Sequence, residues 1–108
     1  MANAFKSSVN ANIVTSGNTI YTTPGSTEST LIGLTLSNKS SGTVTSNVFL
    51  RRSSVDYSIL SNAPILTGST LVPVGGEQKL VLEAADELKI TVSANASVDV
   101  VASLLEIT

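Results

Sequence analysis

Alternation of apolar and polar residues is the feature of this sequence that most restricts its fold. Every second residue is apolar in Leu88–Ser93 and across most of Thr30–Asn38. A period of two places successive side chains on opposite faces of an extended chain, so both stretches are typical of half-buried β-strands. No segment carries a sustained apolar stripe at helical spacing, and the sequence therefore predicts an all-β protein.

Turn signals divide the chain into short segments of this kind. Pro24-Gly25 and Gly75-Gly76 are typical of tight turns, and Asn38–Gly42 has the composition and length of a hairpin loop. We expect about eight short antiparallel strands that form a single-domain, two-layer β-sandwich. Both a jelly-roll and an immunoglobulin-like strand order fit this pattern. The segments predicted as strands are 19–23, 30–38, 44–50, 55–59, 71–74, 78–83, 88–93 and 98–107.

The start of the chain differs from the rest. Residues 1–18 are polar and weakly patterned, and we expect them to form a polar N-terminal arm or an edge strand. Residues 19–108 are expected to form the β-sandwich domain. Polar residues follow Met1–Lys6 where a signal peptide would be apolar, and no apolar run is long enough to span a bilayer. The sequence thus predicts neither a signal peptide nor a membrane partner.

The chain contains neither histidine nor cysteine. Catalytic systems that pair serine or cysteine with histidine are therefore excluded, as are disulfides and thiolate metal sites. The net charge is −2, and no basic patch with interleaved aromatic residues is present, so we expect no nucleic-acid partner. These features predict a protein that is not an enzyme and that needs no cofactor or metal.

Two clusters of charged residues have a structural and a functional interpretation. Glu83, Asp86 and Glu87 could hold calcium, but their spacing does not match a calcium-binding loop, so we expect a solvated acidic turn. Arg51 and Arg52 could contact a phosphate, although arginines at a predicted hairpin tip are more often solvated or interfacial. The acidic cluster could also pair with Arg51 or Arg52 of a neighbouring subunit.

The last predicted strand, Val98–Ile107, is apolar on both sides. Val101, Leu105 and Ile107 give a second face apolar character, opposite the face that begins with Val98. A strand that is apolar on both sides is buried on both sides. It is either a central core strand or a strand whose second face, with Val101, Leu105 and Ile107, closes a contact between subunits.

Four stretches carry a resemblance to a known protein family. They are Asn18–Pro24, Leu31–Asn38, Lys79–Ile90 and Ser97–Ile107, which are spread over most of the chain. In them the sequence resembles small virion structural proteins of tailed bacteriophages, especially phages of marine and cyanobacterial hosts. Members of this family often have Ala-Gly-Asp where this chain has Ala84-Ala85-Asp86. The missing glycine predicts a turn that does not require a positive φ.

The resemblance implies a non-enzymatic phage virion structural protein, located in the virion after assembly in the host cytoplasm. The first expectation is a capsid decoration or cement protein that stabilises the shell. A neck, tail or baseplate component is the alternative within the virion, and a carbohydrate-binding or host-surface-binding β-module is the alternative outside that class. The expected partners are other virion proteins, either the major capsid protein or neck and tail proteins, and further copies of the chain in a homo-oligomer.

Overall fold

The computed structural model describes residues 3–74, 79–95 and 97–108, and in these parts of the chain nine β-strands are joined by turns and loops. The described residues include no helix, and so none that is long and apolar enough to cross a membrane. The predicted turn at Gly75-Gly76 lies outside the described residues. The strands are β1 (Asn3–Asn10), β2 (Asn18–Thr22), β3 (Glu28–Asn38), β4 (Val44–Arg52), β5 (Val55–Ile65), β6 (Thr70–Val74), β7 (Leu80–Leu82), β8 (Glu87–Val92) and β9 (Val98–Ile107).

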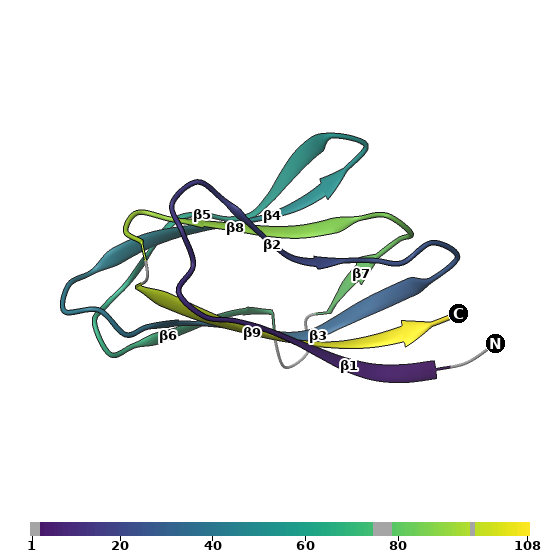
Figure 1. Ribbon diagram of the computed structural model, residues 1–108, viewed down its shortest axis with the longest axis horizontal. Coiled ribbons are helices and arrows are strands. Elements are labelled where there is room, and N and C mark those ends of the chain that lie inside the picture. The colour runs from purple at the N-terminus through teal and green to yellow at the C-terminus, as the bar shows by residue number, and fades with distance from the viewer. Residues whose placement is uncertain (1–2, 75–78, 96) are drawn as a thin grey trace.

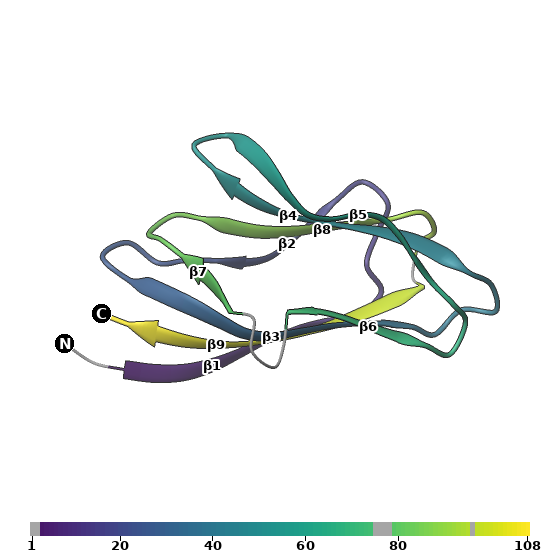
Figure 2. The ribbon, with the colours of Figure 1, turned by 180° about the vertical axis from the view of Figure 1, so that it is seen from behind.

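The strands form two antiparallel sheets that lie face to face (Figure 1 and Figure 2). One sheet has the order β1–β9–β3–β6, and the short strand β7 also pairs with β3. The other sheet has the order β2–β8–β4–β5. The predicted all-β sandwich is therefore confirmed.

Strand pairing is nested around a single hairpin. β4 pairs with β5, β3 with β6, β2 with β8 and β1 with β9. The chain thus folds like one long hairpin that is rolled up into two sheets. Pairing of β3 with β9 connects the strand pairs of one sheet, and pairing of β4 with β8 connects those of the other. This strand order is that of a jelly roll. The structure therefore selects the jelly roll over the immunoglobulin-like order.

The core lies between the sheets and is built from the inward-facing residues of the alternating strands. Every second residue of β8 is buried, and so is every second residue of β9 from Val98 to Leu104. Burial of these aliphatic side chains is the main favourable term for a domain of this size. The largest fully buried side chains include Ile13, Leu31, Leu34, Leu36, Ile65, Leu82, Leu88, Ile90 and Leu104.

The N-terminal residues contribute to the sandwich more closely than their polar composition suggests. Strand β1 pairs with β9 along its whole length, from Asn3 opposite Ile107 to Asn10 opposite Val100. After this edge strand, Ile13 is buried in the core, and its N–H donates to the carbonyl of Val98 at 3.0 Å. The division of the chain into units at residue 18 stays a prediction.

The turn before β8 differs from the sequence prediction. Ala85 has a φ of 70°, so this turn requires the left-handed region although it contains no glycine. The N–H of Ala85 donates to the carbonyl of Thr23, and the N–H of Asp86 donates to the carbonyl of Glu83, both at 3.0 Å. These hydrogen bonds hold an alanine in a conformation that its Cβ disfavours.

Replacing Ala85 by glycine should raise the free energy of unfolding by roughly 0.5–1 kcal/mol, because glycine adopts a positive φ without the steric cost and loses only part of that gain to chain entropy. Ala84→Gly is the matched control, since Ala84 lies in the same turn without a positive φ and should lose stability on this change. Urea unfolding measures both variants. An Ala85→Gly protein less stable than the wild type would contradict the role assigned to this turn.

Candidate functional site

The solvent-facing side of the sheet formed by β1, β9 and β3 carries large exposed apolar side chains. The register places Phe5 of β1 opposite Leu105 of β9, and Val9 opposite Val101. Residues that lie opposite each other in an antiparallel pair project from the same side of the sheet. Phe5 is 80% exposed, Val9 69% and Val101 44%, so this side of β1 and β9 is apolar and open to solvent.

The apolar surface continues across β3 to β7. Thr30 of β3 lies opposite both Leu105 of β9 and Val81 of β7, and Val81 is exposed. The register thus aligns one row of side chains across four strands, with apolar residues on either side of Thr30. We call the surface made by Phe5, Val9, Val81, Val101 and Leu105 the outer face.

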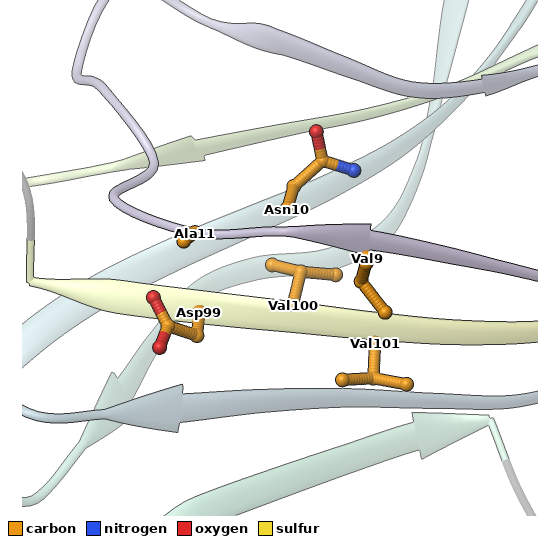
Figure 3. A pocket seen from close by; sticks show the side chains of 6 residues that line it. All are labelled: Val9, Asn10, Ala11, Asp99, Val100 and Val101. Atoms are coloured by element: carbon orange, nitrogen blue, oxygen red, sulfur yellow. The ribbon is translucent and has the colours of Figure 1, made fainter.

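A hollow of about 330 Å³ lies at one end of the outer face, where β1 ends beside the start of β9. Figure 3 shows Val9 and Val101 pointing to one side of the sheet, whereas Asn10 and Val100 point to the other. The remaining lining residues are Ala11 and Asp99.

The described residues place no group of three or more histidine, cysteine, aspartate or glutamate side chains where they could hold a metal ion.

A charged contact fixes the chain next to this hollow. Asp99 Oδ1 accepts a hydrogen bond from the N–H of Asn12 at 3.0 Å and lies 3.0 Å from Lys39 Nζ. The hydrogen bond from Lys39, followed by the one from the Asn12 backbone, lowers the pKa of the Asp99 carboxyl. These contacts join the residues after β1 to the start of β9 and to the loop after β3.

The structure separates the residues that the sequence grouped as a possible subunit interface. Val101, Leu105 and Ile107 lie along one side of β9, on the same sheet as β1. Arg51 and Arg52 lie at the end of β4, in the other sheet. The role of all five residues in a subunit interface stays a prediction.

Sequence reasoning missed the two most exposed members of the outer face, Phe5 and Val9. Both lie in a segment that contains few other apolar residues. The signal that could have found them is their even spacing, which places both on the same side of an extended strand.

Arg52 is engaged by the same chain, and the acidic turn is not fully solvated. Arg52 Nε donates to Asp86 Oδ1 at 2.9 Å, and Arg52 Nη2 donates to Asp86 Oδ2 at 2.6 Å. The Asp86 side chain is only 3% exposed and also accepts the N–H of Glu83 at 2.8 Å. Chiefly because of the Arg52 hydrogen bonds, the pKa of Asp86 lies below its usual value. The expectation of a solvated turn was therefore wrong for Asp86, which joins β4 to the turn before β8.

Asp86→Asn should lower the free energy of unfolding at pH 7 by about 2 kcal/mol, because it removes charge-assisted hydrogen bonds from a buried group. The folded-state pKa of Asp86 is lowered, so its contribution is present at neutral pH and is lost as the pH falls below 3.8 toward the folded-state pKa. Chemical unfolding at several pH values should therefore show the difference between wild type and variant shrinking in acid.

Asp56→Asn is the matched control for this experiment. Asp56 accepts from Arg51 at 3.2 Å, but both side chains are substantially exposed, so the stability change should stay within about 0.5 kcal/mol. Equal losses in the two variants, or a loss in Asp86→Asn that does not depend on pH, would show that the Arg52 contact does not hold this turn.

A different polar contact, made by Tyr21, joins the two sheets. The Tyr21 hydroxyl on β2 donates to the Glu106 carboxylate on β9 and lies 2.7 Å from Ser29 Oγ on β3. Burial, followed by the hydrogen bond with Glu106, raises the pKa of Tyr21 to about 12. The contact gives Glu106 a partner between the sheets, while its neighbours Leu105 and Ile107 lie on the other side of β9.

Comparison with known proteins gives similarity of fold. No protein-family model and no curated protein sequence matches the chain. A solved structure of Bacillus endospore appendages, described as disulfide-linked pili, has a TM-score of 0.60 at 15% identity, over 98% of this chain and 88% of that one. A chain of the T13 viral particle of infectious bursal disease virus has a TM-score of 0.54 at 11% identity, over 96% of this chain and 30% of that one.

A chain of the cyanophage Pam1 capsid is similar over 96% of this chain and 82% of its own length, at 17% identity. Its TM-score of 0.40 is too low to support an argument. At these identities the pilus and viral-particle similarities show the sandwich fold alone. This chain spans less than a third of the length of the viral-particle chain.

Proposed function

We propose that this protein is a structural subunit of a larger assembly, and that the assembly is a phage virion in which the chain decorates the capsid shell. The observation that carries the proposal is the outer face. Five apolar side chains from β1, β7 and β9 share one side of a sheet, and Phe5 and Val9 there are mostly exposed. A grouped apolar surface of this kind is typical of a protein–protein contact.

Two further observations support the virion part of the proposal. The strand order is that of a jelly roll, an architecture that recurs in viral capsid domains. The sequence also resembles small virion proteins of tailed phages in four stretches that span strands of both sheets. The fold similarities to a pilus subunit and a viral-particle protein are consistent with assembly but supply only the fold.

The strength of the proposed attachment depends on the apolar area that each subunit buries and on the number of subunits bound. Burying a few exposed valine and phenylalanine side chains against a shell protein contributes only a few kcal/mol per subunit. Repeated over a symmetric lattice, weak contacts of this size give lasting attachment when subunits are also joined to one another. A neck or tail position would use the same surface with fewer copies.

The test is to add purified protein to phage particles assembled without it and to count bound chains by quantitative mass spectrometry. Wild type should bind in hundreds of copies per particle. Val81→Ser combined with Val101→Ser should bind at least tenfold more weakly, because two apolar contacts are worth about 2–3 kcal/mol together. Both positions are exposed, and neither lies on the edge strand β1 itself.

Val55→Ser is the matched control, since Val55 is an exposed valine on β5 in the other sheet and its loss should leave binding unchanged. A few tens of copies would indicate a neck, tail or baseplate position instead of the shell. Absence of the wild-type chain from particles, or equal binding by the outer-face variant, would contradict the proposal.

A further inference from the structure

In the described residues the two sheets have four edges, and three of them are protected against pairing with another chain. β2 has only five residues and a register shift between Thr19 and Tyr21. β5 pairs with β4 through two register shifts and contains Pro64. The third edge, beyond β3, is shared by β6, which is five residues long and contains Pro73, and by β7, which is three residues long. Short length, bulges and proline are the usual devices that keep an exposed sheet edge from adding a strand.

The fourth edge, β1, has none of these devices. It is eight residues long, contains no proline, and keeps an unbroken register with β9 from Asn3 to Asn10. Lys6 is its only charged residue, so charge, a further device that protects sheet edges, acts at a single position of β1. Figure 1 and Figure 2 show β1 at the outer edge of its sheet, with no strand beyond it. In an antiparallel ladder every second residue of such an edge directs its N–H and C=O away from the sheet.

We propose that β1 pairs antiparallel with β1 of a second copy of the chain, about a two-fold axis at Ser7. The pairing joins the β1–β9–β3–β6 sheets of two copies into one continuous sheet. A two-fold contact uses the same strand on both sides, so the edge must be complementary to itself. The sequence of β1 meets that condition in one register.

The alternating pattern restricts the possible registers. A slip of one residue would place the outer faces of the two copies on opposite sides of the joint sheet. Two registers keep both outer faces on the same side of the joint sheet and still pair nearly the whole length of the two β1 strands. One is centred on Lys6 and the other on Ser7. Centring on Lys6 sets two lysines directly opposite each other, which is destabilising.

Centring on Ser7 removes this repulsion and pairs the apolar residues. Phe5 then lies opposite Val9 of the second copy, and Val9 opposite Phe5 of the second copy. Lys6 of each copy lies opposite Ser8 of the other copy. Aromatic residues paired with β-branched residues contribute roughly 0.2–1 kcal/mol each across antiparallel strands. Because Phe5 and Val9 belong to the outer face, the outer faces of the two copies become continuous across the axis.

This inference deepens the proposed assembly role by naming how subunits join, but its test uses the isolated protein and does not depend on any particle. The chain has no cysteine, so Ser7→Cys introduces a single thiol. In the proposed register the two Ser7 positions are directly opposite, with Cα atoms about 4.5–5.5 Å apart, which lies within the range that a disulfide spans. Mild oxidation should convert most of the Ser7→Cys protein to a covalent dimer.

Ser103→Cys is the matched control, because Ser103 is exposed and lies opposite Ser7 on β9, on the same side of the sheet. In the joint sheet the two Ser103 positions are three strand spacings apart, about 14 Å, and cannot form a disulfide. Adding Val9→Lys to Ser7→Cys should reduce cross-linking at least tenfold, because it sets a charge opposite Phe5 on an edge strand. Circular dichroism verifies that each variant retains its β signal.

Cross-linking of Ser7→Cys no faster than that of Ser103→Cys would overturn the pairing, as would cross-linking that Val9→Lys leaves unchanged. A monomeric mass for the wild type by light scattering, at concentrations where Ser7→Cys also fails to cross-link, would mean that β1 does not pair with a second copy. If the disulfide forms but particles lack the chain, the virion role fails and the strand pairing stands.

Discussion

The position of β9 between β1 and β3 is the constraint on which the rest of the structure depends. β9 pairs with β1 over eight positions and with β3 from Glu28 opposite Ile107 to Asn38 opposite Val98. These two ladders decide which of its apolar sides enters the core. Because side chains alternate, a shift of one residue would exchange the buried side for the exposed one. The apolar outer face is thus a direct consequence of the register that fills the core.

The strands that bury one face could be predicted from sequence, because apolar residues recur at every second position where one side of a strand is buried. β9 was predicted with its observed bounds, and the two-sided pattern of this strand identified Val101, Leu105 and Ile107 as the second face. For the first eighteen residues the sequence allows both an arm and an edge strand. β1 is an edge strand held by backbone pairing to β9, and most of its side chains are exposed, so its sequence carries little pattern.

Contacts between residues distant in sequence could not be predicted from the alternation of apolar and polar residues either. Arg52 and Asp86 are 34 positions apart, and their pairing depends on β4 and the turn before β8 meeting in one sheet. The positive φ of Ala85 was missed for a related reason, since hydrogen bonds to Thr23 impose it against the local preference of alanine. In both cases tertiary structure overrides the local signal.

Edge protection gives the proposed function a physical basis. β2, β5 and β6 each carry a bulge, a proline or both, whereas β1 is regular and borders an apolar surface. A monomer gains nothing from leaving one edge and one face open, since both favour unwanted association. A subunit that must join others gains a defined contact from the same two features, and its other edges stay closed to further growth.

Hydrogen–deuterium exchange of the backbone amides of β1 tests most directly whether this edge is a contact between copies. Exchange would be followed for residues 3–10 over a range of protein concentrations, with β5 and β6 as internal references. Alternate amides of β1 should exchange more slowly as concentration rises, while those of β5 and β6 stay constant, because only β1 gains hydrogen-bond partners. Exchange along β1 that is equally fast at every concentration would contradict the account.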